Sequence, residues 1–264
     1  MFNGIRIFFR YLLFLSRSGN EHSIHSPFIY SLYTEALKPD KRFYVFSEIE
    51  KIRARLFHDK RKISIKDYGA GSKANASTSR KISSIARSAS KSPKLCRLLF
   101  RLANYAESKT ILELGTSFGI STLYLATANK DSAVVTMEGC PDTAAIATEN
   151  FKNIPGKNLN ISIVQGNIDE RLPEALSRIK TIDLVYIDAN HRYEPTLRYF
   201  KEILPFTHEG TVFVLDDIYW SEEMKMAWKS IKQMEEVTVT VDLFHVGLVF
   251  FRKAQPKQHF LLRI

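Results

Sequence analysis

Cysteine is scarce in this sequence of 264 residues. Cys96 and Cys140 are its two cysteines, which are too few for the disulfide framework of a secreted domain. They predict a reducing compartment, and we expect a cytoplasmic protein. No internal repeat is visible, so nothing indicates a repeat protein.

Long hydrophobic runs are also missing. Residues 2–15 are rich in Phe, Ile and Leu, but Arg6 and Arg10 interrupt them, and the stretch is too short to span a bilayer. No small-residue cleavage site follows, so we expect neither a transmembrane segment nor a secretion signal. Residues 5–15 fit an amphipathic helix. We favour its docking on the rest of the protein, with peripheral contact to a membrane surface as the alternative.

Acidic residues are sparse in the first part of the chain. Residues 1–110 hold 22 Lys and Arg against 8 Asp and Glu, a net charge of +14, whereas residues 111–264 hold 16 against 20, a net charge of −4. A basic front predicts contact with an anionic partner: an acyl-CoA or phosphorylated substrate, RNA, or a membrane surface. A solvated surface that favours solubility explains the same charge, and both interpretations stay open.

The first part of the chain has the pattern of helices broken by prolines. Ser92 followed by proline is typical of a helix start. Before it, residues 72–92 are poor in apolar side chains and predict a mobile loop with one short helix near residues 82–86. We divide the chain into a basic, mostly helical extension, residues 1–105, and a second domain, residues 106–264.

The second domain alternates strands and helices. Apolar strands between helices predict a parallel sheet that is covered on both faces, which is a doubly wound α/β fold. Two closely spaced final strands predict an antiparallel hairpin. Strands are expected at residues 110–114, 133–137, 161–165, 182–187, 211–215, 237–243 and 248–252, and helices near residues 119–128, 142–153, 171–178, 193–204 and 221–235.

The first of these strands runs into a glycine turn. The strand stops at Gly115, the turn continues to Gly119 and a helix follows, so backbone N–H groups face a ligand. Glu138 lies 23 residues beyond Gly115, close to where an acid grips ribose hydroxyls in nucleotide-binding units. The G-x-G-x-x-G fingerprint is absent because Ser117 replaces its second glycine, which argues against a nicotinamide-dependent dehydrogenase.

The motif Glu-x-Gly-Thr-x-x-Gly-x-Ser-Thr, which begins at Glu113, resembles the first motif of class I S-adenosylmethionine-dependent methyltransferases. It is most similar to the catechol and caffeoyl-CoA O-methyltransferase branch, and the resemblance covers roughly residues 105–252. It implies a seven-stranded sheet with the seventh strand antiparallel, and S-adenosylmethionine as cofactor. The cofactor-binding candidates that it implies are Glu113, Gly115, Thr116, Ser117, Gly119, Ser121, Glu138, Gly139, Asn167, Ile168 and Asp188.

The resemblance also gives these residues roles. The backbone of the glycine turn lies against the methionyl part of the cofactor, Glu138 binds the ribose hydroxyls, and Asn167 and Ile168 flank the adenine. Each role has an alternative. Glu113 only caps the turn, Asn167 only fixes a loop, and Glu138 is a solvated carboxylate at a helix start.

Three aspartates follow two neighbouring strands. Asp188 ends the fourth strand and Asp216 and Asp217 end the fifth, so their carboxylates converge. Buried like charges repel unless a positive group lies between them, and Mg²⁺ or Ca²⁺ prefers carboxylate oxygens. Matching positions in the resembling enzymes hold a divalent ion, although that pattern has asparagine where Asp217 stands. The alternative has no metal, and Asp216 or Asp217 then orients a loop or meets the sulfonium.

His191 is the candidate catalytic base, with Asp188 as the second catalytic candidate. It follows Asp188 by three residues, where metal-dependent members of the branch usually carry lysine. Histidine titrates near neutral pH and can take a hydroxyl proton. A structural histidine is the alternative. Tyr193 and Trp220 either stack on an aromatic acceptor or serve as packing.

The sequence therefore predicts an S-adenosylmethionine-dependent O-methyltransferase of a small-molecule acceptor, which is anionic in one interpretation. The basic front would form a lid and acceptor pocket. An RNA methyltransferase and a non-catalytic cofactor-binding protein are the alternatives. Residues 67–72, Asp-Tyr-Gly-Ala-Gly-Ser, imitate a cofactor loop, but no apolar strand and helix bracket them, and we expect at most a loop that folds over the substrate.

Overall fold

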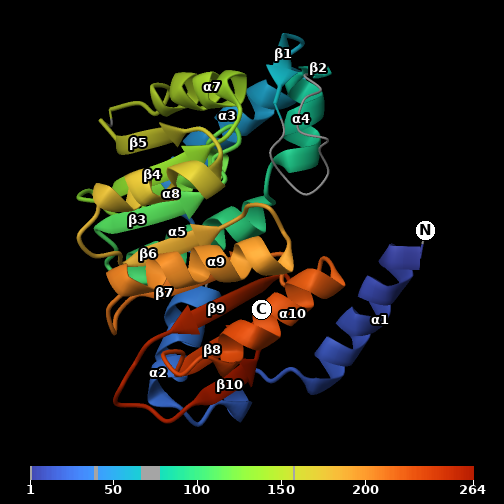
Figure 1. Ribbon diagram of the computed structural model, residues 1–264, viewed down its shortest axis with the longest axis vertical. Helices are drawn as coiled ribbons and strands as arrows, with labels where there is room; N and C mark the ends of the chain where they lie inside the picture. Colours follow the sequence, from blue (N-terminus) through green and yellow to red (C-terminus); the bar gives the residue numbers. More distant parts are fainter. Residues whose placement is uncertain (1, 39–40, 67–77, 157) are drawn as a thin grey trace.

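An eight-stranded sheet forms the centre of the computed structural model, which describes residues 2–38, 41–66, 78–156 and 158–264 (Figure 1). The strand order is β10-β8-β9-β7-β6-β3-β4-β5. The strands are β3 (Thr110–Leu114), β4 (Ala133–Glu138), β5 (Asn160–Gln165), β6 (Leu184–Ile187), β7 (Val212–Asp216), β8 (Val239–Asp242), β9 (Val246–Phe250) and β10 (Gln258–Leu261).

The pairing confirms the predicted doubly wound topology. Strands β3 to β7 are mutually parallel, and β9 pairs antiparallel with both β7 and β8. The order reverses beside β3, which lies between β4 and β6. The expectation of seven strands is wrong by one, because β10 adds an eighth strand parallel to β8. This short edge strand is only partly buried, so its sequence lacks a clear apolar period.

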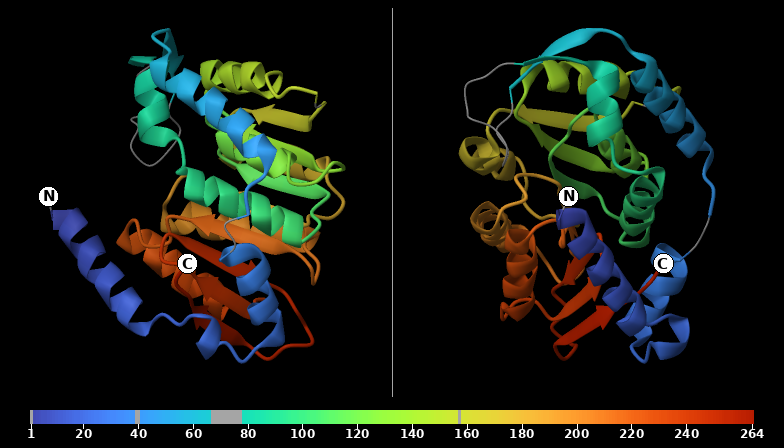
Figure 2. Two further views of the ribbon diagram at one scale, coloured as in Figure 1. Left: turned by 180° about the vertical axis from the view of Figure 1, so that it is seen from behind. Right: turned by 90° about the vertical axis from the view of Figure 1, so that its right-hand side faces the viewer.

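Helices cover both faces of the sheet, as Figures 1 and 2 show. Side chains from α3, α5 and α6 share one core cluster, and side chains from α8, α9 and α10 share the other. The helices are α1 (Phe2–Arg17), α2 (Pro27–Leu32), α3 (Tyr44–His58), α4 (Ile82–Ala89), α5 (Pro93–Tyr105), α6 (Ile120–Ala126), α7 (Pro141–Phe151), α8 (Ile168–Ser177), α9 (Tyr193–Ile203) and α10 (Glu222–Gln233).

The pleat of the central strands divides the core between these two layers. In β7, Val214 belongs to the cluster with α3 and α5, whereas the adjacent Phe213 and Leu215 belong to the cluster with α9 and α10. Successive side chains on a strand point to opposite faces, so a strand that is apolar at every position has to be covered on both sides. This is why the central strands read as unbroken apolar runs.

The front of the chain packs onto this sheet rather than standing apart. Residues from α2 to α5 lie in the same core cluster as residues of β3, β6 and β7. Ser92 caps α5 as expected, and its side chain accepts a hydrogen bond from the Leu95 N–H at 3.2 Å. The front also contains an antiparallel pair that the sequence did not indicate, β1 (Lys62–Ile65) and β2 (Thr78–Lys81). The boundary between residues 105 and 106 stays a prediction, and residues 67–72 lie outside the described residues.

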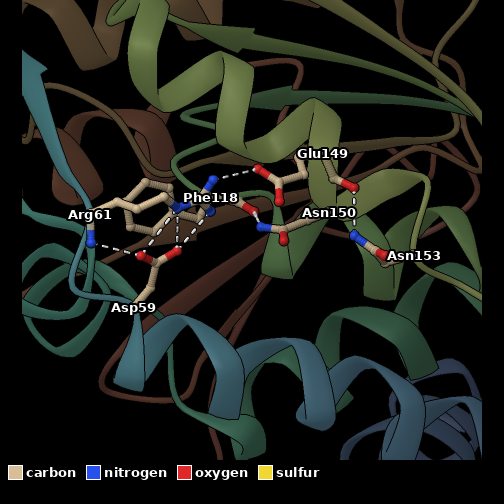
Figure 3. A network of polar contacts seen from close by, with 6 residues as sticks. All are labelled: Asp59, Arg61, Phe118, Glu149, Asn150 and Asn153. Carbon is tan, nitrogen blue, oxygen red and sulfur yellow. Dashed lines mark hydrogen bonds and ion pairs between the residues drawn. The ribbon is translucent and has the colours of Figure 1, made fainter.

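A polar network ties the β1 end of the front to α7 (Figure 3). Arg61 donates to the Asp59 carboxylate and, at 3.2 Å, to Glu149 Oε2. Next to it, Asn150 Nδ2 donates at 2.9 Å to the Phe118 carbonyl oxygen in the glycine turn. Ser64 N donates to Asp142 Oδ2 at 2.8 Å. The front is therefore anchored beside the helix that follows β4.

Helix α1 lies at the side of the molecule and its first end projects from it (Figures 1 and 2). Its Phe14 ring contacts Phe244 with centroids 5.5 Å apart, and Arg10 forms an ion pair with Glu222. Phe8 and Phe9 on the other side are exposed. One face of α1 is thus docked, as we favoured, and its other face stays open to a further contact. No helix in the described ranges is long and apolar enough to cross a membrane.

The contact between β9 and α10 leaves no room for a side chain at Gly247. A Cβ there would lie 2.8 Å from Trp228 Cζ3. The Trp228 ring is buried, and its Nε1 donates to Asp242 Oδ2 at 3.1 Å, so the ring cannot easily retreat. Small-to-large changes in a packed core typically cost about 1–3 kcal/mol.

We therefore expect Gly247→Ala to lower the free energy of unfolding by about 1–3 kcal/mol in urea titrations. Gly210→Ala is the control, because its added Cβ meets only the exposed ring of its neighbour His208, at 3.2 Å. An unfolding midpoint of Gly247→Ala equal to that of the control would contradict this packing.

Candidate active site

The loops at the carboxyl ends of the strands carry most of the unusual backbone of the described chain. Five of its six non-glycine residues with positive φ lie in the loops after β3, β6, β7 and β8. Such conformations cost about 1–3 kcal/mol each and cluster at functional sites. The five are Ser117, Asn190, His191, Asp217 and Phe244.

Glycine is required where the β3 and β6 loops meet. Gly115 has φ +103°, and a Cβ there would lie 2.3 Å from the carbonyl oxygen of Asp188. Gly119, with φ +77°, begins α6, and a Cβ there would lie 2.3 Å from the Phe151 ring. Any larger residue at either position would push the turn away from its neighbours.

A cavity of about 260 Å³ lies beyond this turn. The front of the chain contributes Ile65, Lys66 and Ile85 to its wall, and the other walls are the loops after β3, β4, β5 and β6. Seven of the predicted cofactor-binding residues meet here. They are Gly115, Ser117, Glu138, Gly139, Asn167, Ile168 and Asp188.

Glu138 is held in this cavity by backbone groups. Its Oε2 accepts from the Ser117 N–H at 2.8 Å, and its Oε1 accepts from the Cys140 N–H at 2.9 Å. The positive φ of Ser117 turns that N–H toward the carboxylate. An ionised carboxylate can accept about four hydrogen bonds, so this geometry is compatible with hydroxyl donors as well.

The other predicted cofactor residues lie behind the turn and do not line the cavity. Glu113 is fully buried, and its carboxyl oxygens accept from Ser121 at 2.6 Å, from Thr122 at 2.5 Å and from Thr136 at 2.7 Å. Thr116 Oγ1 is 2.6 Å from Thr136 Oγ1. Direct cofactor contact of Glu113, Thr116, Gly119 and Ser121 stays a prediction. Their side chains or close packing hold the glycine turn in place from the side away from the cavity.

Burial controls the charge of Glu113. Desolvation raises the pKa of this carboxyl to about 7, although the Ser121, Thr122 and Thr136 hydroxyls oppose the shift. A group in a fully buried site keeps its proton longer than in the unfolded chain. The turn is therefore built on a carboxyl that is about half ionised near neutral pH.

The three aspartates converge as predicted, but a lysine lies among them. Lys91 Nζ is 2.9 Å from Asp188 Oδ1, 2.5 Å from Asp216 Oδ2 and 3.6 Å from Asp217 Oδ2. Lys91 belongs to the loop between α4 and α5, far from the aspartates in sequence. The positive group that the carboxylates require is therefore supplied by the chain itself.

The charges of this cluster follow from burial and from the ion pairs. Burial alone would lower the pKa of Lys91, but the Asp188 and Asp216 carboxylates raise it above its ordinary range. Burial would raise the pKa of Asp188, but His191 and Lys91 hold it below its usual value. Burial and the Asp188 charge raise the pKa of Asp216 to about 7. Lys91 is thus a cation beside an ionised Asp188.

The donor set does not fit a divalent ion alongside this lysine. An ion bound at about 2.0–2.6 Å from the carboxylate oxygens would occupy the space of the Lys91 ammonium. No group of three metal-ligating side chains is found in the part of the chain that the structure describes. The metal site at Asp188, Asp216 and Asp217 is not supported, and we assign no step to a metal.

His191 contacts Asp188 from the other side. Its Nε2 is 3.3 Å from Asp188 Oδ1, and its Nδ1 is buried with no hydrogen-bond partner among the described residues. Burial lowers the pKa of His191, but the hydrogen bond to Asp188 outweighs it and the pKa is raised. With Trp220, His191 lines a hollow of about 630 Å³ outside the first cavity. The Tyr193 hydroxyl lies 3.2 Å from Ser230 Oγ, a packing contact.

A second cavity, of about 520 Å³, lies on the Lys91 side of the aspartates. Its polar end is formed by Lys91, Asp216 and Asp217. The sequence did not predict its other walls, because they come from four segments that share no motif. The apolar wall residues are Tyr11, Phe14 and Leu15 of α1, Leu95 and Leu98 of α5, Leu243 and Val246 near the β8–β9 turn, and Ile264.

Comparisons with known proteins agree with this fold. Residues 112–218 match the family model described as a methyltransferase domain. A catechol O-methyltransferase from Niastella koreensis is 33% identical over 129 residues, which cover 48% of this chain and 57% of that protein. One from Mycobacterium tuberculosis is 31% identical over 144 residues, which cover 54% and 61%. The chain thus spans a little over half the length of these curated relatives.

Solved structures share the fold over most of the chain. The methyltransferase PaMTH1 from Podospora anserina, solved with S-adenosylhomocysteine, has a TM-score of 0.60 at 15% identity and covers 87% of this chain and 97% of its own. The O-methyltransferase TomG from Streptomyces achromogenes, solved with S-adenosylmethionine, has a TM-score of 0.56 at 20% identity and covers 84% and 95%. Residues 112–218 therefore match a methyltransferase domain, the chain shares the fold of these enzymes, and the resemblance drawn from its sequence is confirmed.

The raised pKa of Glu113 predicts a pH-dependent stability. A carboxyl whose pKa is higher in the folded state than in the unfolded state stabilises fully below its ordinary value, 4.5, and this stability is lost as the pH rises through about 7. Between pH 5.5 and pH 8 the loss amounts to about 2 kcal/mol. Glu113→Gln cannot ionise. In urea titrations at the two pH values, we expect its free energy of unfolding to fall by about 2 kcal/mol less than that of the unchanged protein.

Glu209→Gln is the matched control, because Glu209 is exposed. It should follow the unchanged protein at both pH values. An equal loss in Glu113→Gln and in the unchanged protein would show that Glu113 does not ionise in this range.

Proposed function

We propose that this protein is an S-adenosylmethionine-dependent O-methyltransferase of a small molecule, with the cofactor in the first cavity and the acceptor in the second. The observation that carries the proposal is the Glu138 carboxylate, fixed by the Ser117 and Cys140 N–H groups within a cavity that the glycine turn closes. The methyltransferase domain match over residues 112–218 and the names of the relatives support the same activity.

The first cavity suits a nucleoside. Glu138 would accept from the ribose hydroxyls, and Asn167 and Ile168 would lie beside the adenine. The glycine turn would lie against the methionyl part, as the sequence resemblance implies. Bound there, S-adenosylmethionine supplies an electrophilic methyl group. The chain's own residues hold the cofactor in place and bring the acceptor oxygen into line.

The second cavity suits an acceptor with an apolar body and a hydroxyl at one end. Its walls combine apolar side chains from α1, α5 and the β8–β9 turn with polar ones, and Lys91, Asp216 and Asp217 form one polar end. Asp188 lines the first cavity and pairs with Lys91 of the second, so the two cavities approach each other at this ion pair. Lys94 and Arg263 also line the second cavity and favour an acceptor with an additional anionic group. A cavity of about 520 Å³ suits a small molecule better than an RNA strand.

The proton of the acceptor hydroxyl needs a base. We keep His191 in this role: it lines the hollow beside the aspartate cluster rather than the second cavity, and its Nε2 is 3.3 Å from Asp188 Oδ1. Asp188 orients the imidazole and stabilises its charged form, which is what a carboxylate partner does for a histidine base. The cytoplasmic location and a membrane contact of α1 stay predictions.

Replacing Glu138 tests the cofactor site. We expect Glu138→Ala to weaken the binding of S-adenosylhomocysteine, measured by calorimetry, about 10- to 100-fold, because it removes charge-assisted hydrogen bonds worth about 1.5–3 kcal/mol. Glu138→Gln keeps one acceptor oxygen, so its affinity for S-adenosylhomocysteine should lie between those of the unchanged protein and Glu138→Ala. Glu235→Ala, an exposed glutamate that lines neither cavity, is the control.

The proposal fails if the unchanged protein binds no S-adenosylhomocysteine, or if Glu138→Ala binds it as tightly as Glu235→Ala does. A circular dichroism spectrum that matches the unchanged protein shows that the alanine variant is folded.

Replacing His191 tests the base. With catechol as the first acceptor probe, His191→Gln should lower kcat about 10²- to 10⁴-fold, the usual contribution of a positioned base. The affinity for S-adenosylhomocysteine should stay within about threefold, because His191 does not line the first cavity. His208→Gln is the matched control, since His208 Nε2 also pairs with an aspartate, Asp183, at 2.9 Å. Equal kcat values for the two variants would exclude His191 as the base.

A further inference from the structure

The acidic cluster of the candidate site already has a counter-ion. Asp216 is almost completely buried, with 2% of its side chain exposed, and Asp188 is 15% exposed. Carboxylates this close together and this poorly hydrated cannot all ionise without a cation between them. The Lys91 ammonium lies within 3.6 Å of all three aspartates and contacts two of them directly.

The position of Lys91 is built into the fold. Arg53 of α3, which is 4% exposed, donates from Nη1 to the Lys91 carbonyl oxygen. Arg53 is fixed in turn by Glu50, with Nε 2.9 Å from Oε2. On the other side, Ser92 caps α5 and begins a helix directly after the lysine. A backbone held at both sides aims the Lys91 side chain at the ends of β6 and β7.

We propose that Lys91 takes the place of a divalent cation at this edge of the sheet, so that methyl transfer proceeds without a metal and the ammonium binds the acceptor oxygen. The inference rests on the proposed O-methyltransferase function for its catalytic part. Its structural part, the exclusion of a metal from the cluster by Lys91, is independent of that function.

The chemistry of the ammonium suits this role. A lysine has three N–H donors, and those directed at Asp188 and Asp216 account for two of them. The third can donate to an acceptor oxygen in the second cavity, which Lys91 lines. There it stabilises the oxyanion that remains when the hydroxyl loses its proton, as a point charge would. Lys91 is then a catalytic residue in the sense that it touches the reacting oxygen.

The charge balance also favours one monovalent cation. Three carboxylates and one ammonium leave the cluster with a net charge of about −2. A negative cluster attracts a sulfonium cation at the neighbouring cavity, whereas an added divalent ion would repel it.

Calorimetry with MnCl₂ and MgCl₂ tests the structural part. We expect no binding to the unchanged protein at millimolar metal. Lys91→Met keeps the length of the side chain and removes its charge, so the uncompensated carboxylates should bind Mn²⁺ at least about tenfold more tightly than in the unchanged protein. The control is Lys180→Met. Lys180 is exposed and precedes β6, at the end of the strand opposite to Asp188, so this variant should behave like the unchanged protein.

Methyl transfer in the presence of a chelator tests the catalytic part. The unchanged protein should keep its full rate in excess EDTA. Lys91→Met should lose at least about 10²-fold in kcat while its affinity for S-adenosylhomocysteine stays within about threefold, because Lys91 does not line the first cavity. Lys91→Arg keeps a cation in the loop and should still exclude metal. Lys91→Gln also removes the charge and replaces Lys91→Met in the binding assay if that variant does not fold.

Two results overturn the proposal. One is an unchanged protein that loses methyl transfer in EDTA and regains it with Mg²⁺, or that binds Mn²⁺ as tightly as Lys91→Met does. The other is a folded Lys91→Met with the kcat and metal affinity of the unchanged protein. If the unchanged protein transfers no methyl group at all, the proposed function fails, and the calorimetric comparison still decides whether Lys91 excludes a metal.

Discussion

The ion pair between Lys91 and the aspartates at the ends of β6 and β7 is the constraint on which the site depends. A doubly wound sheet brings its strand ends together, and here those ends carry carboxylates with little access to water. Breaking a buried pair by removing one partner typically costs about 3–5 kcal/mol, because it leaves an uncompensated charge. The loop between α4 and α5 is therefore held against the sheet edge by electrostatics as much as by packing. The loop lines the second cavity, and its Lys91 pairs with Asp188, which lines the first.

A second constraint lies beneath the glycine turn. The close approach of Gly115 to the Asp188 carbonyl oxygen and the three hydroxyls around Glu113 fix the turn from two directions. With the turn fixed, the Ser117 N–H points at Glu138. The side chains that hold the loop and those that face the cavity thus alternate along the same motif. Pre-organisation of this kind lowers the cost of ordering a binding site around its ligand.

The sequence predicts the sheet well because its central strands are long, apolar and separated by helices, and it predicts Glu138 because spacing along one βαβ unit fixes its place. It predicts that the aspartates converge for the same topological reason. It cannot predict Lys91, since a lysine in a polar stretch before a helix cap resembles any solvated lysine until the fold brings it to the carboxylates. Glu113 shows a second limit. A residue of a binding motif can point away from the cavity and hold the turn in place, and the sequence does not show on which side of the strand it lies. The pair β1–β2 and the edge strand β10 are four residues each, too short for a clear apolar period.

The uneven charge of the chain takes on a different meaning once the fold is known. The sequence alone leaves two interpretations of the basic front open, contact with an anionic partner and a solvated surface that favours solubility. Three of its basic side chains instead pair with acids of the second half: Arg10 with Glu222, Arg61 with Glu149, and Lys91 with the aspartate cluster. The first two pairs are exposed and contribute little, whereas the third is largely shielded from water. Part of the positive charge of the front is therefore neutralised by acidic residues of the second half, and these pairs hold the front against the sheet. The remaining positive charge is available to an acceptor or another partner.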